Sequence, residues 1–235
     1  EEVVSRNYLL EERPDVIIDL VDATNIERNL YLTTQLIETG IPVVIALNMA
    51  DLLKKRGIRI DTRKLSDLLG CPVIETSALK RMGLSELLLE VRRTAKKEQG
   101  SLPKRIFSED LEQAVERVSD LLPAEVEEEQ KRWYAVKLLE QDKKVMGRWK
   151  TGASSHVSVD EIRKKLEEKY DDDMESIITD QRYQFVQKVV GASVKKSKEK
   201  MTISDRIDQI VTSRIFGIPI FIAVMFVVYY ISVTT

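Results

Sequence analysis

The stretch Val43–Asp51, VVIALNMAD, decides the fold. Its first five residues are apolar and begin with three β-branched side chains, a pattern typical of a strand buried on both faces of a parallel sheet. The polar pair Asn48-x-x-Asp51 follows the strand directly. Because ligands bind at the carboxyl ends of the strands in such sheets, this pair is the first candidate for a binding site.

Strand-like and helix-like segments alternate on either side of this stretch. Short apolar runs bounded by polar or turn residues predict strands at Val16–Val21 and Pro72–Thr76. Helices are expected at Glu27–Thr39, Asp61–Leu69 and Leu84–Glu98. This βαβαβα order with short connections predicts a doubly wound α/β sheet.

The second half of the chain predicts an all-helical domain. Gln99–Lys104 contains Gly and Pro and is interpreted as a linker, and no strand pattern follows it as far as about Lys200. We therefore expect one domain at residues 1–100 and a second at residues 101–205. Helices are expected from Ser108, over Pro123–Gln141, from the capping-box residue Ser158, and over about Met174–Val194.

The end of the chain differs from the rest. No Asp, Glu, Lys, Arg or His occurs from Ile215 to Thr235, although 32% of the whole chain is charged. A helix of this length would rise about 31 Å, close to the bilayer core of about 30 Å. Residues 206–235 are therefore expected to form a juxtamembrane segment and one transmembrane helix of a longer protein. Basic residues precede this helix and none follows it, which places residues 1–214 in the cytoplasm.

Composition excludes several classes of site. Lys and Arg number 37 against 39 Asp and Glu, a balance that argues against a general nucleic-acid partner. One cysteine, Cys71, excludes an internal disulfide and a Cys-based zinc site, and one histidine excludes a multi-histidine metal centre. Cys71 stands between Gly and Pro and is interpreted as a small buried residue.

The spacing Asn48-x-x-Asp51 is that of the guanine-reading motif of GTPases. An ionised Asp is acceptor-only, and guanine presents its N1–H and N2–H donors side by side, whereas adenine does not. Ser77-Ala78-Leu79 follows the next strand and would offer a backbone N–H to guanine O6. Met49 replaces the usual Lys and could lay an apolar stem against the base. The alternative is that Asn48 and Asp51 only cap a helix.

The phosphate-binding motifs of a GTPase are missing. No G-x-x-x-x-G-K-[ST] pattern occurs, and Gly147–Ser154 has the glycine spacing but carries Ala153 in place of Lys. Asp67–Gly70 resembles D-x-x-G, but it follows N-x-x-D instead of preceding it, so we interpret it as a helix end. The sequence as given thus lacks the machinery for the phosphates and Mg²⁺.

Long stretches of the chain resemble the ferrous iron transport protein B family of bacterial inner-membrane transporters. Asp19–Asp61 and Leu69–Leu88 are very similar to the GTPase domain of that family, and Arg214–Thr235 resembles its first membrane helix. The resemblance implies the C-terminal part of a P-loop GTPase-like domain, with its N-terminal part missing, and then a helical regulatory domain. By position, it implies that guanine is bound by Asn48, Met49, Asp51, Ser77, Ala78 and Leu79.

The resemblance also implies a function, cofactors and partners. The intact protein would be a GTPase that binds GTP or GDP, with Mg²⁺ ligands upstream of this chain and Fe²⁺ as the transported substrate. Partners would be the lipid bilayer of the inner membrane, a small cytoplasmic Feo protein and further copies of the chain. No residue here is assigned a catalytic role. Two alternatives are a membrane-tethered GTPase switch that recruits a soluble partner, and a helical interaction module that binds no nucleotide.

Overall fold

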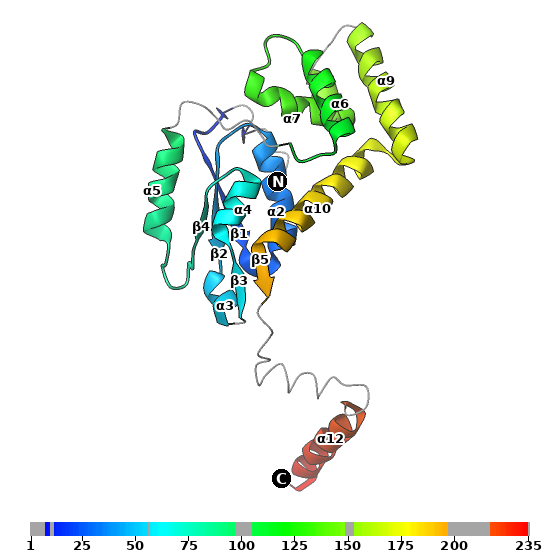
Figure 1. Ribbon diagram of the computed structural model, residues 1–235. Coiled ribbons are helices and arrows are strands. Elements are labelled where there is room, and N and C mark those ends of the chain that lie inside the picture. The colour runs from blue at the N-terminus through cyan, green and yellow to red at the C-terminus, as the bar shows by residue number, and fades with distance from the viewer. Residues whose placement is uncertain are drawn as a thin grey trace.

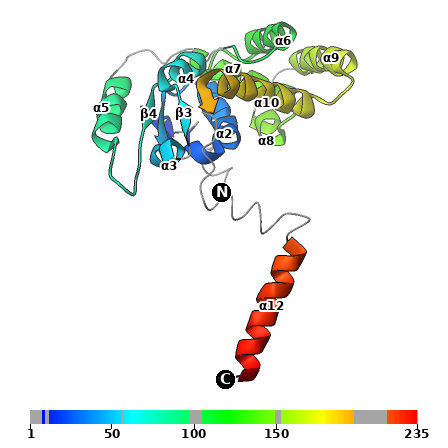
Figure 2. The same ribbon diagram turned by 60° about the horizontal axis from the view of Figure 1, so that its bottom comes forward.

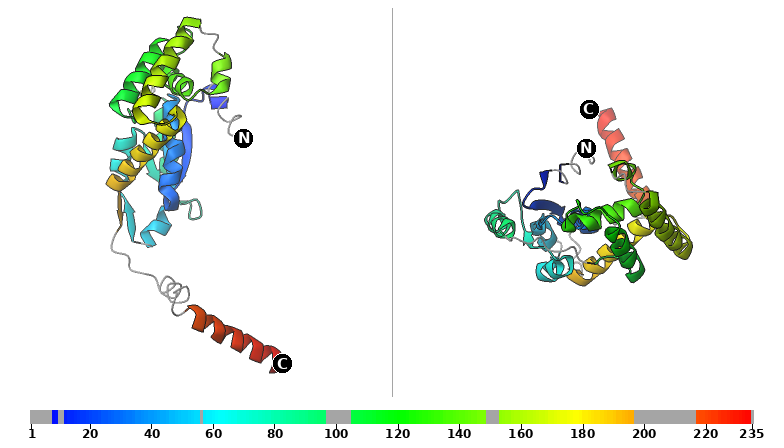
Figure 3. Two further views of the ribbon diagram at one scale, coloured as in Figure 1. Left: turned by 90° about the vertical axis from the view of Figure 1, so that its right-hand side faces the viewer. Right: turned by 90° about the horizontal axis from the view of Figure 1, so that it is seen from above.

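The computed structural model describes residues 8–9, 12–55, 57–96, 105–148, 153–196 and 217–234. An α/β lobe runs from β1 (Ile17–Asp22) to α5 (Leu84–Ala95), and a helical lobe from α6 (Glu109–Asp120) to α9 (Ala153–Tyr170). The two lobes are shown in Figure 1. The long helix α10 (Met174–Ser193) runs from the helical lobe along the α/β lobe, as the left view of Figure 3 shows.

The sheet of the α/β lobe is parallel and has the strand order β1-β2-β4. Its central strand β2 (Val43–Asn48) pairs with β1 on one side and with β4 (Val73–Glu75) on the other. Asp22 and Asn48, the last residues of β1 and β2, are partners in the register. The carboxyl ends of the strands therefore meet at one edge, as the strand pattern predicts.

Helices cover both faces of this sheet. Val43, Ile45 and Leu47 of β2 point to the core shared with α2 (Ile26–Glu38), α4 (Thr62–Leu69) and α10. Val44 and Ala46 point to the opposite face, where they pack with Leu87 of α5. This alternation along one strand confirms the predicted strand that is buried on both faces in a doubly wound arrangement.

The predicted caps of α4 are present. The Asp61 carboxylate accepts a hydrogen bond from the Lys64 amide over 3.1 Å, which satisfies a free donor of the first turn. Gly70 ends the helix with a φ of 79°, a left-handed conformation that glycine adopts without strain. The short elements η1 (Ala23–Asn25) and α3 (Ala50–Lys55) follow β1 and β2.

A second, two-stranded sheet was not predicted. The strand β3 (Ile58–Ile60) pairs antiparallel with β5 (Val194–Lys196), which follows α10 directly. The Asp61 amide extends this pairing by donating to the carbonyl of Ser193 over 2.9 Å. The prediction that no strand occurs in the second half is therefore wrong. Segments of three residues are too short to show an apolar period, and this pair forms only because α10 brings β5 back to the α/β lobe.

Two helix starts also differ from the prediction. Helix α9 begins at Ala153, so Ser158 lies inside it and is no N-terminal cap. Helix α7 (Glu128–Leu139) begins after a turn that follows Pro123, because the Val126 amide donates to the Pro123 carbonyl over 3.1 Å. Helix α8 (Lys143–Arg148) completes the helical lobe.

Helix α10 contributes to two separate cores. Its first turns place Met174, Ile177 and Ile178 among the buried residues of the helical lobe. Its last turns place Val186, Val189 and Val190 in the core of the α/β lobe. One helix therefore joins the two lobes through packed side chains.

The C-terminal helix α12 (Gly217–Thr234) stands apart from the other elements in Figure 2. Among the residues that the structure describes, no helix combines the length and apolarity needed to cross a bilayer. The transmembrane helix predicted within residues 206–235 is therefore not found among the described residues, which include Gly217–Thr234 of that segment. The expected linker at residues 99–104 and the expected juxtamembrane stretch lie outside the described residues.

Candidate functional site

A hydrogen bond joins the two loops in which the sequence predicts base-contacting residues. The Asn48 side-chain oxygen, at the end of β2, accepts from the backbone amide of Ala78 over 3.1 Å. Ala78 lies in the loop after β4, 30 positions further along the chain. The Asn48 oxygen therefore bonds to another loop and not to helix α3, as the capping alternative would require.

The turn after β2 has an unusual backbone. Met49 adopts a φ of 63°, in the left-handed region that few non-glycine residues occupy. Its carbonyl accepts from the Leu52 amide over 3.0 Å, which closes the first turn of α3 and places Asp51 in that turn. The Met49 side chain is 40% exposed, so an apolar stem is available at the surface of this edge.

The Asp51 carboxylate faces the second loop. Asp51 Oδ2 lies 2.9 Å from Lys80 Nζ, and the Asp51 side chain is 14% exposed. The hydrogen bond from Lys80 lowers the pKa of Asp51, and a hydrogen bond from the Ser77 side chain adds to this effect. Asp51 is therefore ionised at neutral pH and can only accept hydrogen bonds.

The loop after β4 is a tight turn. Ser77 and Met82 exchange two backbone hydrogen bonds of 3.1 Å each. Gly83 follows with a φ of 76°, and a Cβ atom there would lie 2.0 Å from the carbonyl oxygen of Glu75. Ser77 is buried, whereas Leu79 is 92% exposed. The backbone of this loop is therefore held in place while the side chain of Leu79 points outward.

In the turn after β1, the Asp22 carboxylate accepts hydrogen bonds from neighbouring residues of the same turn. Asp22 Oδ1 accepts from the Thr24 amide over 2.8 Å and from the Thr24 hydroxyl over 2.7 Å, and Asp22 Oδ2 accepts from Asn25. Burial raises the pKa of Asp22, but these hydrogen bonds outweigh it, and the pKa is lowered overall. Asp22 thus stabilises η1 and lies next to Asn48 in the register.

Lys80 and Gly83 belong to the site although the sequence motifs do not indicate them. Lys80 contacts Asp51 from 29 positions away, and no spacing rule connects a loop lysine with such a partner. Gly83 could have been suspected as a turn residue, because glycine supplies a positive φ at low cost.

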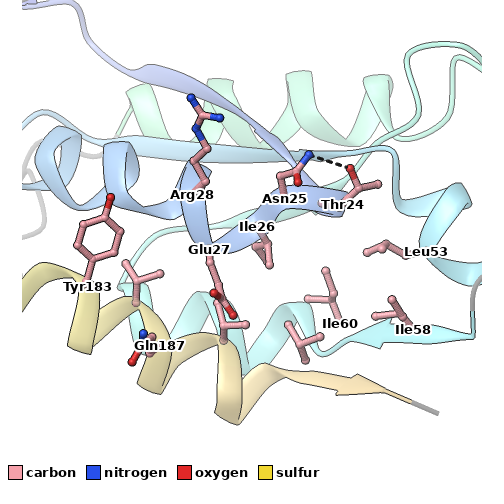
Figure 4. Close-up of a pocket in the computed structure, with 14 residues that line it drawn as sticks. Thr24, Asn25, Ile26, Glu27, Arg28, Leu53, Ile58, Ile60, Tyr183 and Gln187 are labelled. Carbon is pink, nitrogen blue, oxygen red and sulfur yellow. Dashed lines mark hydrogen bonds between the residues drawn. The ribbon is translucent and has the colours of Figure 1, made fainter. Parts of the chain in front are cut away.

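A cavity of about 530 Å³ lies beside this edge, between the start of α2, strand β3 and helix α10 (Figure 4). Its walls include Ile26, Leu53, Ile58 and Ile60, and Tyr183 and Gln187 of α10 line its other side. None of the predicted base-contacting residues lines it. The cavity and the edge that holds Asp51 are therefore separate features.

Within the described ranges, no group of three or more His, Cys, Asp or Glu side chains is placed to hold a metal ion. Cys71 is buried and belongs to the core of the α/β lobe, in agreement with its interpretation as a packing residue.

Comparison with known proteins decides the family. Residues 1–91 match the family model for Ferrous iron transport protein B, and residues 107–195 match that for the FeoB cytosolic helical domain. A crystal structure of an S. thermophilus NFeoB mutant bound to GDP is 42% identical to the chain, with a TM-score of 0.79. The match covers 83% of this chain and 75% of that one. The chain belongs to the FeoB family.

Curated FeoB relatives match almost the whole chain. A fusion of Fe(2+) transport protein A and FeoB from Porphyromonas gingivalis is 39% identical over 97% of this chain, and FeoB of Escherichia coli is 34% identical over 99%. The match spans 29% and 30% of the length of these two proteins. The chain thus corresponds to less than a third of such a FeoB protein.

Proposed function

We propose that the chain is the guanine-binding and regulatory portion of a ferrous iron transporter. The observation that carries this proposal is the hydrogen bond of 3.1 Å between the Asn48 side chain and the Ala78 amide, which joins the two loops beside Asp51. The joined loops bring together the ionised Asp51 carboxylate, the Asn48 side-chain amide and the exposed backbone of the loop after β4. This is the chemistry that guanine requires.

Each residue of the proposed site has a distinct role. Asp51 accepts from N1–H and N2–H of guanine, and Ser77 holds its carboxylate in position. Asn48 keeps the second loop in register with the first. Met49 lays its side chain against the base. The backbone amide of Leu79 donates to guanine O6, because the amide of Ala78 is bonded to Asn48. A base without the paired donors leaves the carboxylate unsatisfied and is rejected.

The residues present fit the base of GTP or GDP and not the rest of the nucleotide. The S. thermophilus relative was crystallised with GDP, which supports a guanine nucleotide as the ligand. Phosphate contacts and Mg²⁺ ligands would come from parts of the intact protein outside this chain, and they would supply the chemistry of GTP hydrolysis. This chain contributes recognition of the base and the helical lobe that responds to it.

A shared helix supports coupling between the nucleotide site and the rest of the transporter. Because α10 packs in both cores, a shift of the α/β lobe on nucleotide binding would move the helical lobe with it. Such coupling requires that guanine nucleotide binds two arrangements of the lobes with different affinities. Residues 1–214 would then form the cytoplasmic portion of an inner-membrane protein.

The remaining partners are proposed from the relatives. Ferrous iron is the proposed cargo, since the relatives are named Fe(2+) transporters. The fusion of Fe(2+) transport protein A to FeoB in Porphyromonas gingivalis supports a small Feo protein as a partner. We further propose contact with the bilayer through the rest of the intact protein, and assembly with further copies of the chain. Fe²⁺ uptake by cells that depend on the intact protein tests the transport function.

Binding of GDP to the intact protein tests the proposed site. Asp51→Ala should weaken GDP binding at least about a hundredfold, because two charge-assisted hydrogen bonds are lost. Asp67→Ala is the matched control: Asp67 is an exposed aspartate of α4, and its removal should leave GDP affinity unchanged. Equal affinity in the wild type and in Asp51→Ala would refute the proposed site.

A further inference from the structure

The acceptor of the proposed guanine site already has a partner within the chain. Lys80 Nζ lies 2.9 Å from Asp51 Oδ2, and Lys80 directly follows the predicted base-contacting residues of its loop. The Lys80 side chain is 45% exposed, and that of Asp51 is 14% exposed. The ammonium group thus reaches from the solvent side onto a half-buried carboxylate.

The backbone of the loop that carries Lys80 is held by hydrogen bonds, but the Lys80 side chain can rotate. Besides the paired hydrogen bonds of Ser77 and Met82, the Lys80 amide donates to the Ser77 carbonyl over 3.2 Å. The Arg81 amide donates to the Ala78 carbonyl over 3.3 Å, and both bonds hold the turn. A lysine side chain is a flexible four-carbon stem. Lys80 can therefore leave Asp51 by side-chain rotation while the loop backbone stays in place.

Lys80 and guanine require the same acceptor. Guanine donates from two adjacent groups and needs both oxygens of one carboxylate, whereas the ammonium of Lys80 occupies Oδ2. The Lys80 end of this ion pair is open to solvent, and ion pairs at the surface are weak in water, so a base that supplies two hydrogen bonds can displace Lys80. Without Lys80, the half-buried Asp51 carboxylate would keep its hydrogen bond from Ser77 but lose its counter-ion, which is costly for a partly buried charge.

We propose that Lys80 is a competing counter-ion of the guanine site: it pairs with Asp51 while the site is empty and is displaced when guanine binds. The proposal rests on the guanine-binding function proposed above. Its consequence is that Lys80 lowers the affinity for guanine nucleotides and speeds their release, while it holds the Asp51 carboxylate in position in the empty site.

The test is GDP affinity by calorimetry, and the release rate of a fluorescent GDP derivative, in the intact protein. Lys80→Met keeps most of the stem and removes the charge, so it should bind GDP about two- to fivefold more tightly and release it more slowly by a similar factor. Lys80→Arg keeps the charge and should remain close to the wild type. Arg81→Met removes a neighbouring exposed charge from the same turn and should also leave the GDP affinity unchanged.

Repeating the Lys80→Met substitution in the Asp51→Ala variant separates competition for Asp51 from a direct effect of Lys80 on the bound base. In Asp51→Ala the competitor has lost its target, so adding Lys80→Met should no longer change GDP affinity. A gain that persists in this background, or weaker GDP binding by Lys80→Met alone, would overturn the proposal. Weak binding by Asp51→Ala combined with no effect of Lys80→Met overturns the role of Lys80 and leaves the guanine site standing. If Asp51→Ala binds GDP with wild-type affinity, both the guanine site and the role of Lys80 are refuted.

Discussion

At the scale of single residues, Asn48 is the side chain on which the site depends most. We predict that Asn48→Ala lowers GDP affinity of the intact protein about tenfold, because the loop after β4 loses its hydrogen bond to β2. Calorimetric titration with GDP measures the effect. Asn29→Ala is the control, since it removes a comparable hydrogen bond of 2.9 Å from Asn29 of α2 to the carbonyl of Asn25 in η1. Equal losses in both variants would contradict a specific role for Asn48.

A second residue-scale prediction concerns Asp19, a buried carboxylate in β1. The Thr33 hydroxyl donates to it over 2.5 Å, and burial raises the pKa of Asp19 while this hydrogen bond lowers it, with a net upward shift. The folded state then holds this proton more tightly than the unfolded state, so stability falls as pH rises through the raised pKa.

Asp19→Asn keeps an acceptor for Thr33 and removes the buried charge. We expect the free energy of unfolding at pH 7 to increase by about 1 kcal/mol. The gain should vanish below about pH 3, where Asp19 is protonated in both states of the wild type. Urea denaturation at a series of pH values measures this difference, and a gain that does not depend on pH would contradict the assignment to the charge.

The sequence predicts the place of the site better than its contacts. Asn48, Asp51 and Ser77 come together because each lies at or just after the end of a strand of one parallel sheet, and strand ends can be predicted from apolar runs. The contact of Lys80 could not be predicted. It depends on positive φ values of 53° at Arg81 and 76° at Gly83, which no periodicity reveals.

At the scale of elements, longer strands are easier to predict from the sequence than shorter ones. Strand β2 has six residues, five of them buried, so its pattern is visible in the sequence. Strands β3 and β5 have three residues each, and their pairing depends on where a helix of 20 residues ends. Helix α4 was predicted with both ends because its caps, Asp61 and Gly70, are local signals.

The start of α5 gives an element-scale prediction. A Cβ atom at Gly83 would overlap the Glu75 carbonyl, and the positive φ adds strain. We predict that Gly83→Ala lowers the free energy of unfolding by about 2 to 3 kcal/mol. Gly147→Ala is the matched control, because nothing lies within 4 Å of a Cβ there and Gly147 is in helix α8.

Thermal and urea denaturation should show Gly147→Ala to be neutral, or more stable by up to about 1 kcal/mol. Comparable destabilisation by both substitutions would mean that the close approach at Gly83 does not decide the stability of this turn.

At the scale of the whole molecule, a buried ion pair joins the two lobes. Arg182 of α10 is 1% exposed, with Nη2 at 2.7 Å from Glu38 Oε2 of α2 and Nη1 at 2.9 Å from Glu140 Oε1 at the end of α7. Burial alone would lower the pKa of Arg182, but Glu38 and Glu140 raise it above its usual value, so it stays charged. Arg182 therefore binds one carboxylate from each lobe.

The two lobes also approach each other closely at Gly40, where there is no room for a side chain. A Cβ atom at Gly40, after α2, would lie 2.3 Å from the carbonyl oxygen of Glu129 in α7. The chain thus combines the packing of α10 in both cores, the bonds of Arg182 and a close backbone contact. The boundary predicted at residue 100 separates two segments of sequence, but α10 belongs to the cores on both sides.

The last prediction concerns Arg182, which binds a carboxylate from each lobe. Arg182→Met leaves the Glu38 carboxylate buried without its cation, while Glu140 keeps its ion pair with Lys137. The substitution should lower the free energy of unfolding by about 3 to 5 kcal/mol. Adding Glu38→Gln should recover part of the loss, since it removes one uncompensated charge. The surface control Arg93→Met breaks a pair with Glu90 at 3.8 Å and should change stability by less than about 1 kcal/mol.

Two probes show whether Arg182 holds the lobes together. Tryptophan fluorescence reports on the helical lobe through the buried Trp133, and far-ultraviolet circular dichroism reports on both lobes. In the wild type the two urea transitions should coincide, because α10 must leave both cores at once. In Arg182→Met the helical lobe should unfold at lower urea than the rest, since it keeps fewer bonds across the boundary. Coincident transitions in Arg182→Met with a loss below about 1 kcal/mol would show that the apolar packing of α10 alone couples the lobes.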